Sequence, residues 1–84
     1  MMEVHIHPHA YERLAERGAT EEEIVLTVQT GERFAARFGR TGFRRNLPFK
    51  KRWRGKRYKT KQVEAYAIRQ HDGWLVISAV TRYF

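Results

Sequence analysis

The spacing of hydrophobic and polar residues at the start of the chain predicts a short helix. Pro8 suits the first position of a helix that runs to about Arg17, and Gly18 suits the left-handed residue that ends it. The buried side of this helix is expected to consist of its apolar residues, Ala10, Tyr11 and Leu14. The segment is therefore poor in large aliphatic side chains.

A second helix is predicted from about Glu21 to Thr30. Thr20 followed by Glu23 has the spacing of a capping box, in which each side chain accepts a hydrogen bond from the backbone N–H of the other residue. Glutamates fill the first turn, where the helix dipole favours negative charge, and Gly31 ends the helix. The apolar arc of this helix is Ile24, Val25 and Val28.

The spacing of hydrophobic and polar residues along the chain changes after the second helix. Residues 33–38 are predicted as a strand and residues 39–42 as a turn. From residue 43 to residue 58 there is no clean period, and Pro48 and Gly55 interrupt the segment. We interpret it as a long, partly extended arm, because long loops of this kind often carry function. Its expected anchors are Phe43, Leu47, Phe49 and Trp53.

The end of the chain has the pattern of a β-hairpin. Residues 62–71 and 74–84 flank Asp72-Gly73, a dipeptide that favours a two-residue turn. The register predicted from this turn pairs His71 with Trp74, Ile68 with Ile77, Tyr66 with Ala79 and Glu64 with Thr81. Together the elements predict a single α+β domain over residues 1–84, with two N-terminal helices packed on a three- or four-stranded antiparallel sheet.

Charge is strongly segregated along the chain. The first 32 residues have a net charge of −5, whereas the remaining residues have a net charge of +13. Ten cations lie between Arg44 and Lys61 with no carboxylate among them, and Phe49, Trp53 and Tyr58 are interleaved with the cations. Phosphates would neutralise such a run, and aromatic faces stack on unpaired bases. The alternative is a solvated basic loop, or a counterpart for the chain's own acidic helices.

The basic arm, at about residues 43–61, is therefore the predicted nucleic-acid site. The residues expected to contact RNA are Arg44, Arg45, Lys50, Lys51, Arg52, Trp53, Arg54, Lys56, Arg57 and Tyr58.

Composition restricts the compartment and the cofactors. The chain has no cysteine, so disulfides and thiolate metal sites are excluded. Its most apolar stretch, residues 74–80, is too short to cross a bilayer, and the N-terminus lacks a charged and then apolar leader. His5 and His7 alternate with His9, but Pro8 interrupts the strand and leaves an incomplete ligand set. We expect a cytosolic protein with no membrane partner, no metal and no cofactor.

Several catalytic mechanisms are excluded by the residues that the chain lacks. Ser78 is the only serine and lies within a predicted strand, which disfavours an exposed serine nucleophile. Asp72 and Glu64 are the only carboxylates after residue 32, too few for a two-metal nuclease. RNA cleavage by acid–base chemistry remains open, because the ribose 2′-hydroxyl supplies the nucleophile.

The first predicted helix carries a candidate catalytic stripe. His9, Arg13 and Arg17 are spaced four residues apart and therefore lie along one side of a helix. In the functional interpretation His9 transfers a proton, and the two arginines bind the phosphate. The alternative is a solvated helix face with an ion pair between Arg13 and Glu16.

This helix resembles a known family. The run His9-Ala10-Tyr11-Glu12-Arg13-Leu14-Ala15-Glu16-Arg17-Gly18 is similar to the opening helix of the family catalogued as domain of unknown function 4258, whose pattern is His-Ala, then Arg three residues on, then Glu-Arg-Gly. The acidic start of the second helix and the closing hairpin, with Trp74-Leu75-Val76-Ile77-Ser78, are similar as well. The arm at residues 44–61 is an elaboration that many smaller members lack.

The resemblance implies a RelE/ParE-like toxin fold, in a superfamily that includes ribonucleases but also members that are not ribonucleases. It places His9, Arg13 and Arg17 at the characteristic polar positions of the family. Tyr83 falls near a C-terminal strand position where RelE-like enzymes place working side chains. The full catalytic set of those enzymes is not reproduced in this chain.

Three hypotheses follow from the sequence. The first is an RNA-binding, toxin-like domain that acts as a metal-independent endoribonuclease with His9, Arg13, Arg17 and Tyr83 as its catalytic residues. The second is a non-catalytic nucleic-acid-binding module. The third is a basic partner of an acidic, antitoxin-like protein, or a homodimer held together by its oppositely charged segments.

Overall fold

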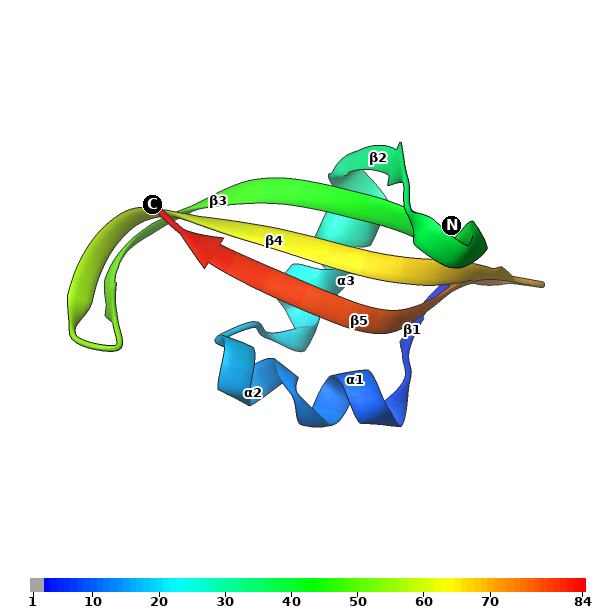
Figure 1. Cartoon of the computed structure of the whole chain (residues 1–84), viewed down its shortest axis with the longest axis horizontal. Helices are drawn as coiled ribbons and strands as arrows, with labels where there is room; N and C mark the ends of the chain where they lie inside the picture. The colour runs from blue at the N-terminus through cyan, green and yellow to red at the C-terminus, as the bar shows by residue number, and fades with distance from the viewer. Residues whose placement is uncertain (1–2) are drawn as a thin grey trace.

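The computed structural model describes residues 3–84, which form a long, twisted sheet with the helices on one side (Figure 1). In chain order the elements are β1 (Glu3–Ile6), α1 (Pro8–Glu12), α2 (Leu14–Arg17), α3 (Glu21–Thr30), β2 (Glu32–Ala35), the 3₁₀ turn η1 (Arg37–Gly39), β3 (Thr41–Trp53), β4 (Lys56–Gln70) and β5 (Gly73–Tyr83). Within residues 3–84, no helix has the length and apolar character needed to span a membrane.

The predicted architecture of two helices on a three- or four-stranded antiparallel sheet is wrong. The described residues form a five-stranded sheet in the order β1-β5-β4-β3-β2, with three short α-helices. The sheet is mixed, because β1 runs parallel to β5 while the other pairs are antiparallel. Strands hold 57% of the residues and helices 27%, so the protein is mainly sheet. The sequence predicted a short extended segment at residues 3–7, but its pairing with β5 joins residues about 70 positions apart and leaves no local signal.

The segment predicted as an arm is a β-hairpin. Strands β3 and β4 pair from Thr41 opposite Ala67 as far as Trp53 opposite Lys56. The two turn residues, Arg54 and Gly55, have φ angles of 51° and 85°. Positive φ at both positions is the geometry of a type I′ turn, whose twist matches that of the strands it joins. The register shifts between Pro48 and Lys51, which marks a bulge partway along the hairpin.

The predicted first helix is divided into two. Helix α1 ends at Glu12, and Arg13 has φ −92° and ψ −6° with its amide bonded to the carbonyl of Ala10 three residues back. Gly18 is left-handed, at φ 74°, and ends α2 as predicted. Tyr11 was expected to be buried, but it is 52% exposed because α1 and α2 turn only Ala10 and Leu14 toward the sheet.

The second predicted helix is confirmed. Helix α3 spans the predicted residues, and Thr20 and Glu23 form both hydrogen bonds of the capping box. Ile24 and Val28 are buried, and Val25 is half-buried. Capping depends on residues within one turn of each other, which explains why the sequence located this helix accurately.

The C-terminal hairpin is present with a different register from the one predicted. Gln70 lies opposite Gly73, so the loop residues are His71 and Asp72. Gly73 instead lies inside the sheet, where a Cβ atom would come within 1.9 Å of the carbonyl oxygen of Glu3 on β1. A bulge between Tyr66 and Ala67 moves Tyr66 opposite Ser78.

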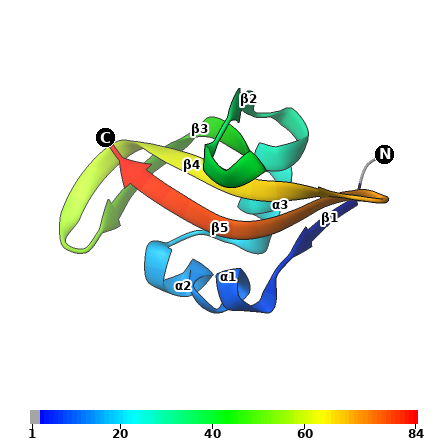
Figure 2. The same cartoon turned by 45° about the vertical axis from the view of Figure 1, so that its right-hand side comes forward.

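The helices cover one face of the sheet and leave the other face open (Figures 1 and 2). The core between helices and sheet contains Leu14, Ala19, Ile24, Val28, Phe43, Val63, Ala65, Ala67, Trp74, Val76 and Ala79. Because side chains alternate along a strand, Glu64 and Tyr66 of β4 point away from this core. We call the surface that they share with Arg44, Ser78 and Arg82 the open face.

Candidate nucleic-acid interface

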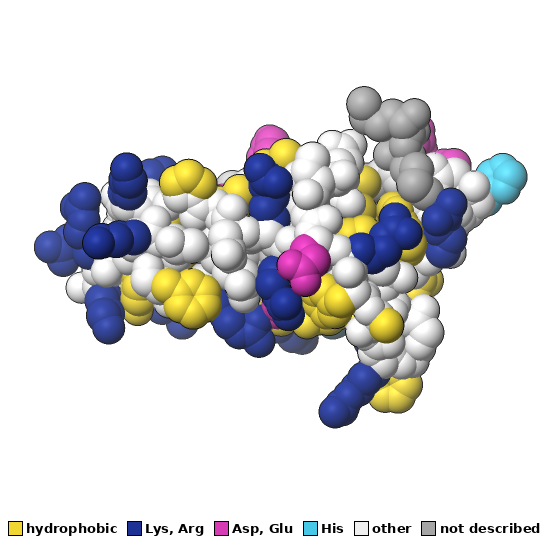
Figure 3. All heavy atoms as spheres, turned by 90° about the horizontal axis from the view of Figure 1, so that it is seen from above, with side chains coloured by type: hydrophobic (Ala, Val, Ile, Leu, Met, Phe, Trp, Pro, Cys, Tyr) yellow, Lys and Arg dark blue, Asp and Glu magenta, His cyan; other side chains and the backbone are white. Residues whose placement is uncertain are grey.

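The far end of the β3–β4 hairpin carries a dense group of cations. Its exposed basic residues, here called the basic tip, are Lys50, Lys51, Arg52, Arg54, Lys56, Arg57 and Lys59. Figure 3 shows these dark-blue side chains gathered at one end of the molecule, which measures 41 × 25 × 24 Å. The sequence has no carboxylate between Glu32 and Glu64, so no acidic residue lies within the tip.

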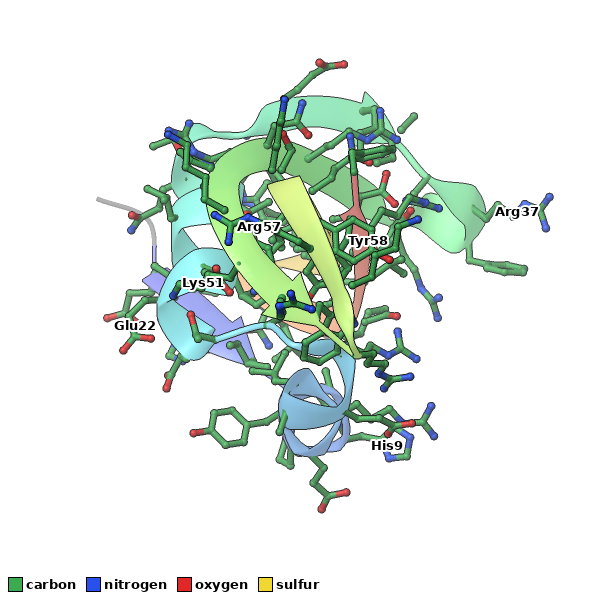
Figure 4. The ribbon with its side chains drawn as sticks, turned by 90° about the vertical axis from the view of Figure 1, so that its left-hand side faces the viewer. His9, Glu22, Arg37, Lys51, Arg57 and Tyr58 are labelled. Carbon is green, nitrogen blue, oxygen red and sulfur yellow. The ribbon has the colours of Figure 1, made fainter. Side chains whose placement is uncertain are left out.

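The pairing of the strands brings like charges together in the tip. Arg52 lies directly opposite Arg57, and like charges at opposed positions destabilise a sheet. Figure 4 views this end of the molecule and labels Lys51, Arg57 and Tyr58 on the hairpin. The repulsion would be relieved by bound phosphate, so the tip is suited to an anionic ligand.

The aromatic residues of the hairpin gather around Tyr83 of β5. Ring centroids of Phe49, Trp53 and Tyr58 lie 5.1, 5.2 and 5.5 Å from that of Tyr83. The Trp53 ring is stacked on Tyr83 with an interplanar angle of 18°. All four side chains are half-buried. Trp53 therefore both anchors the tip and retains some exposed surface, and the sequence had suggested both an anchoring and a stacking role for it.

The tip is fastened to the end of α2. Arg54 donates a hydrogen bond of 2.9 Å to the carbonyl oxygen of Glu16. Lys61, which is 4% exposed, donates to the carbonyl oxygen of Gly18 and lies 2.7 Å from a carboxylate oxygen of Glu23. Because these bonds join residues far apart in the sequence, they hold the hairpin in a fixed position relative to the helices.

Arg44, predicted to contact nucleic acid, has a structural partner. Its Nη2 atom lies 2.5 Å from Glu64, whose side chain is 2% exposed, and Arg82 forms a second ion pair with the same carboxylate. Burial raises the pKa of Glu64, but the hydrogen bonds and charges of Arg82 and Arg44 outweigh burial and hold the pKa below its usual value. Glu64 therefore stays ionised and fixes two half-exposed guanidinium groups on the open face.

Arg45 also lies outside the basic tip. It lies opposite the buried Val63, and its Nε atom is buried with no hydrogen-bond partner among the described residues. Its half-buried position within the sheet places it away from the exposed cations of the tip.

The structure brings three of the predicted catalytic residues together. His9, Arg13 and Arg17 line a groove of about 70 Å³ between the short helices and β5, with Ala10, Leu14, Ile77, Ser78 and Ala79. His9 and Arg13 are exposed, whereas Arg17 is half-buried and donates a hydrogen bond to the carbonyl oxygen of Ala79. One nitrogen of Arg17 thus binds the free edge of β5, which leaves His9 and Arg13 as the accessible members.

Tyr83 does not line the groove of His9. It lines a neighbouring pocket of about 250 Å³ with Glu16, Arg17, Trp53, Arg54 and Thr81. Its hydroxyl lies 3.4 Å from the carbonyl oxygen of Arg17, and burial raises the pKa of Tyr83. The predicted catalytic set is therefore divided between two pockets that share Arg17.

The N-terminal histidines have separate surroundings. Nε2 of His5 lies 3.0 Å from Glu3 and 3.8 Å from Asp72, and all three residues are exposed. His7 lies beyond β1 and caps α1 by accepting a hydrogen bond of 3.1 Å from the amide of His9. His7 therefore has a structural role as the N-cap of α1.

A pocket on the open face was not predicted from the sequence. It has a volume of about 570 Å³ and is lined by Phe34, Ala35, Ala36, Arg37, Phe38, Arg40, Tyr66 and Ser78. Its residues come from β2, η1, β4 and β5, so no single segment contains the pattern. The only local signal was Arg37-Phe38-Gly39-Arg40, in which an aromatic residue lies between two arginines within a turn.

Comparison with known proteins finds no family model, no curated protein and no solved structure that matches the chain. The resemblance of the first helix to domain of unknown function 4258 therefore remains a prediction.

Proposed function

We propose that this protein binds single-stranded RNA through the basic tip. The observation that carries the proposal is a group of seven exposed cations, with no acidic residue among them, at the end of a hairpin that is fixed to the helices. The preference for single strands rests on the half-buried rings of Trp53 and Tyr58, because stacking requires unpaired bases. The preference for RNA over DNA rests on the family resemblance.

Salt dependence tests this proposal. We expect the affinity for a 12-nucleotide single-stranded RNA, measured by fluorescence anisotropy in EDTA, to fall with a log–log slope of about −3 to −5. Each phosphate contact on a single strand contributes about 0.7 to that slope, and five to seven contacts are available at the tip. A slope near zero would contradict binding through the tip.

An acidic protein surface is a different ligand that the basic tip could bind. The exposed Glu21 and Glu22 at the start of α3 could bind the tip of a second copy, and an acidic, antitoxin-like protein would have the same chemistry. Self-association of the RNA-free protein that disappears at high salt, together with no affinity for RNA, would favour protein binding over our proposal.

RNA cleavage is a second candidate activity, and the groove of His9 and Arg13 favours it. In this reaction His9 removes the proton from the ribose 2′-hydroxyl, and the resulting oxyanion attacks the adjacent phosphorus. Arg13, the accessible arginine of the groove, stabilises the charge that develops on the phosphoryl oxygens. The bond to the 5′-oxygen then breaks, and that oxygen takes up a proton, leaving a 2′,3′-cyclic phosphate.

We expect RNA incubated with the protein in EDTA to yield products that end in 2′,3′-cyclic phosphate. His9→Ala should slow this cleavage by a factor of about 100 or more while changing RNA affinity by less than about threefold, because general base catalysis contributes to rate and not to binding. Tyr11→Ala, which changes an exposed residue of the same helix, is the matched control. RNA that stays intact with several sequences would leave binding as the only activity.

A further inference from the structure

The η1 turn holds an aromatic side chain in an unfavourable state. Phe38 has a left-handed backbone, with φ 59° and ψ 37°, and its side chain is 84% exposed. For a residue with a Cβ atom both features cost free energy and contribute nothing to the core. The turn is nevertheless closed by a 3.0 Å hydrogen bond from the amide of Ala36 to the carbonyl of Arg40. The fold thus maintains Phe38 at the rim of the open-face pocket, which indicates a functional role.

The wall of this pocket is aromatic and firmly held. Phe34 and Tyr66 meet edge to face, with ring centroids 6.1 Å apart. The Tyr66 hydroxyl donates a 3.3 Å hydrogen bond to Glu64, the buried carboxylate that also holds Arg44. The guanidinium of Arg44 lies 4.6 Å from the centre of the Phe34 ring. Glu64 therefore positions both an aromatic wall and a cation beside the pocket.

The charged residues that line the pocket are all basic. Arg37 and Arg40 line it, and the Arg40 guanidinium lies 5.5 Å from the centre of the Phe38 ring. None of the described residues that line the pocket is acidic. Figure 4 shows Arg37 extending away from the body of the protein, accessible to a ligand. The pocket thus combines aromatic faces, a Ser78 hydroxyl and cations, which are the groups that bind a base and its neighbouring phosphates.

We infer that this pocket binds one unpaired nucleobase of the RNA whose backbone lies on the basic tip, an inference that rests on the proposed function. The base stacks on Phe38, and Arg37 and Arg40 contact the flanking phosphates. An acidic peptide with an aromatic side chain would suit the same charges. A nucleobase is favoured because β4 reaches from the pocket, at Tyr66, to the basic tip, so one strand of RNA can follow it from one site to the other.

The distance between the two sites is compatible with a short oligonucleotide. Tyr66 at the pocket and Arg57 at the tip lie on the same strand, and the usual rise of about 3.3 Å per residue separates them by at most about 30 Å. The hydrogen-bonded pair of Asn46 and Gln62, together with Arg82, lies between them on the open face. The intervening surface is therefore polar and basic, as an RNA backbone requires.

Phe38→Ala tests the inference by anisotropy with a 12-nucleotide single-stranded RNA and with the same RNA annealed as a duplex. We expect about a tenfold loss of affinity for the single strand, the usual effect of removing a stacking ring, and less than a twofold loss for the duplex, which offers no unpaired base. The melting temperature should change by less than about 3 °C, because the side chain is largely exposed. Tyr11→Ala, another exposed aromatic residue outside the pocket, should leave both affinities unchanged.

The outcomes separate the two proposals. If the wild type binds RNA with the expected salt slope but Phe38→Ala binds the single strand normally, the pocket takes no base and the tip remains the RNA site. If the wild type binds a random copolymer of glutamate and tyrosine in a manner that requires Phe38, and binds no RNA, the pocket is a peptide site. Absence of salt-dependent binding to any RNA overturns both proposals.

Discussion

Gly18→Ala is expected to lower the free energy of unfolding by about 3 kcal/mol. The new Cβ would lie 2.3 Å from the Tyr83 hydroxyl and 2.7 Å from the Trp53 ring, so the rings that fasten the hairpin to α2 would have to move. Overpacking of this kind costs about 1–3 kcal/mol, and alanine at the observed φ of 74° adds about 1 kcal/mol or more. For a domain of this size the melting temperature should fall by about 12 to 24 °C in a thermal unfolding experiment.

Gly39→Ala is the matched control for the steric part of this effect. Gly39 has a similar φ of 70°, but a Cβ atom there would have no neighbour within 4 Å. We expect a loss of only about 1 kcal/mol, which arises from the backbone alone. Adding Tyr83→Phe to Gly18→Ala removes the nearest clashing atom and should restore part of the lost stability. Equal effects of Gly18→Ala and Gly39→Ala would show that the hairpin does not dock on Gly18 in solution.

The second large effect concerns the basic tip. Replacing Lys51, Arg52, Arg57 and Lys59 by glutamine should weaken single-stranded RNA binding about 200-fold at 0.15 M salt. Each lost phosphate contact removes about 0.7 from the log–log slope, which corresponds to about a fourfold change at that salt concentration. The four side chains are exposed, and removing the opposed Arg52 and Arg57 relieves repulsion, so the melting temperature should not fall.

A pair of double variants gives the control. Arg52→Gln with Arg57→Gln should lose about 15-fold in affinity, whereas Arg33→Gln with Arg69→Gln removes the same charge near Trp74, away from the tip, and should lose less than about threefold. If both double variants weaken binding equally, RNA responds to the net charge of the protein and not to the basic tip.

Local signals accounted for the parts of the fold that the sequence predicted correctly. The capping box at Thr20 and Glu23, the left-handed Gly18 and the β4–β5 hairpin all depend on residues close together in the chain. The hairpin register was predicted incorrectly because the pairing of β1 with Gly73 and the bulge at Tyr66 depend on contacts from other parts of the chain. The long β3–β4 hairpin was missed because its bulge interrupts the alternation of side chains on which strand prediction depends.

The candidate site also had parts that the sequence located and parts that only the tertiary structure decided. The sequence alone located the run of cations and the spacing of His9, Arg13 and Arg17, because charge and helical period are properties of a continuous segment. Which arginines remain free for a ligand was decided by the tertiary structure: Arg44 is held by a carboxylate twenty residues away, while Arg52 and Arg57 are exposed.

The sequence thus determined both ends of α3, the glycine that ends α2, the existence of the last hairpin and the region of positive charge. Only the tertiary structure decided that β1 joins the sheet, that Trp53 stacks on Tyr83, and that Phe38 and Tyr66 meet at one pocket. The physical reason is that capping and charge density act over a few residues, whereas strand pairing and side-chain packing join residues that the chain brings together only when it folds.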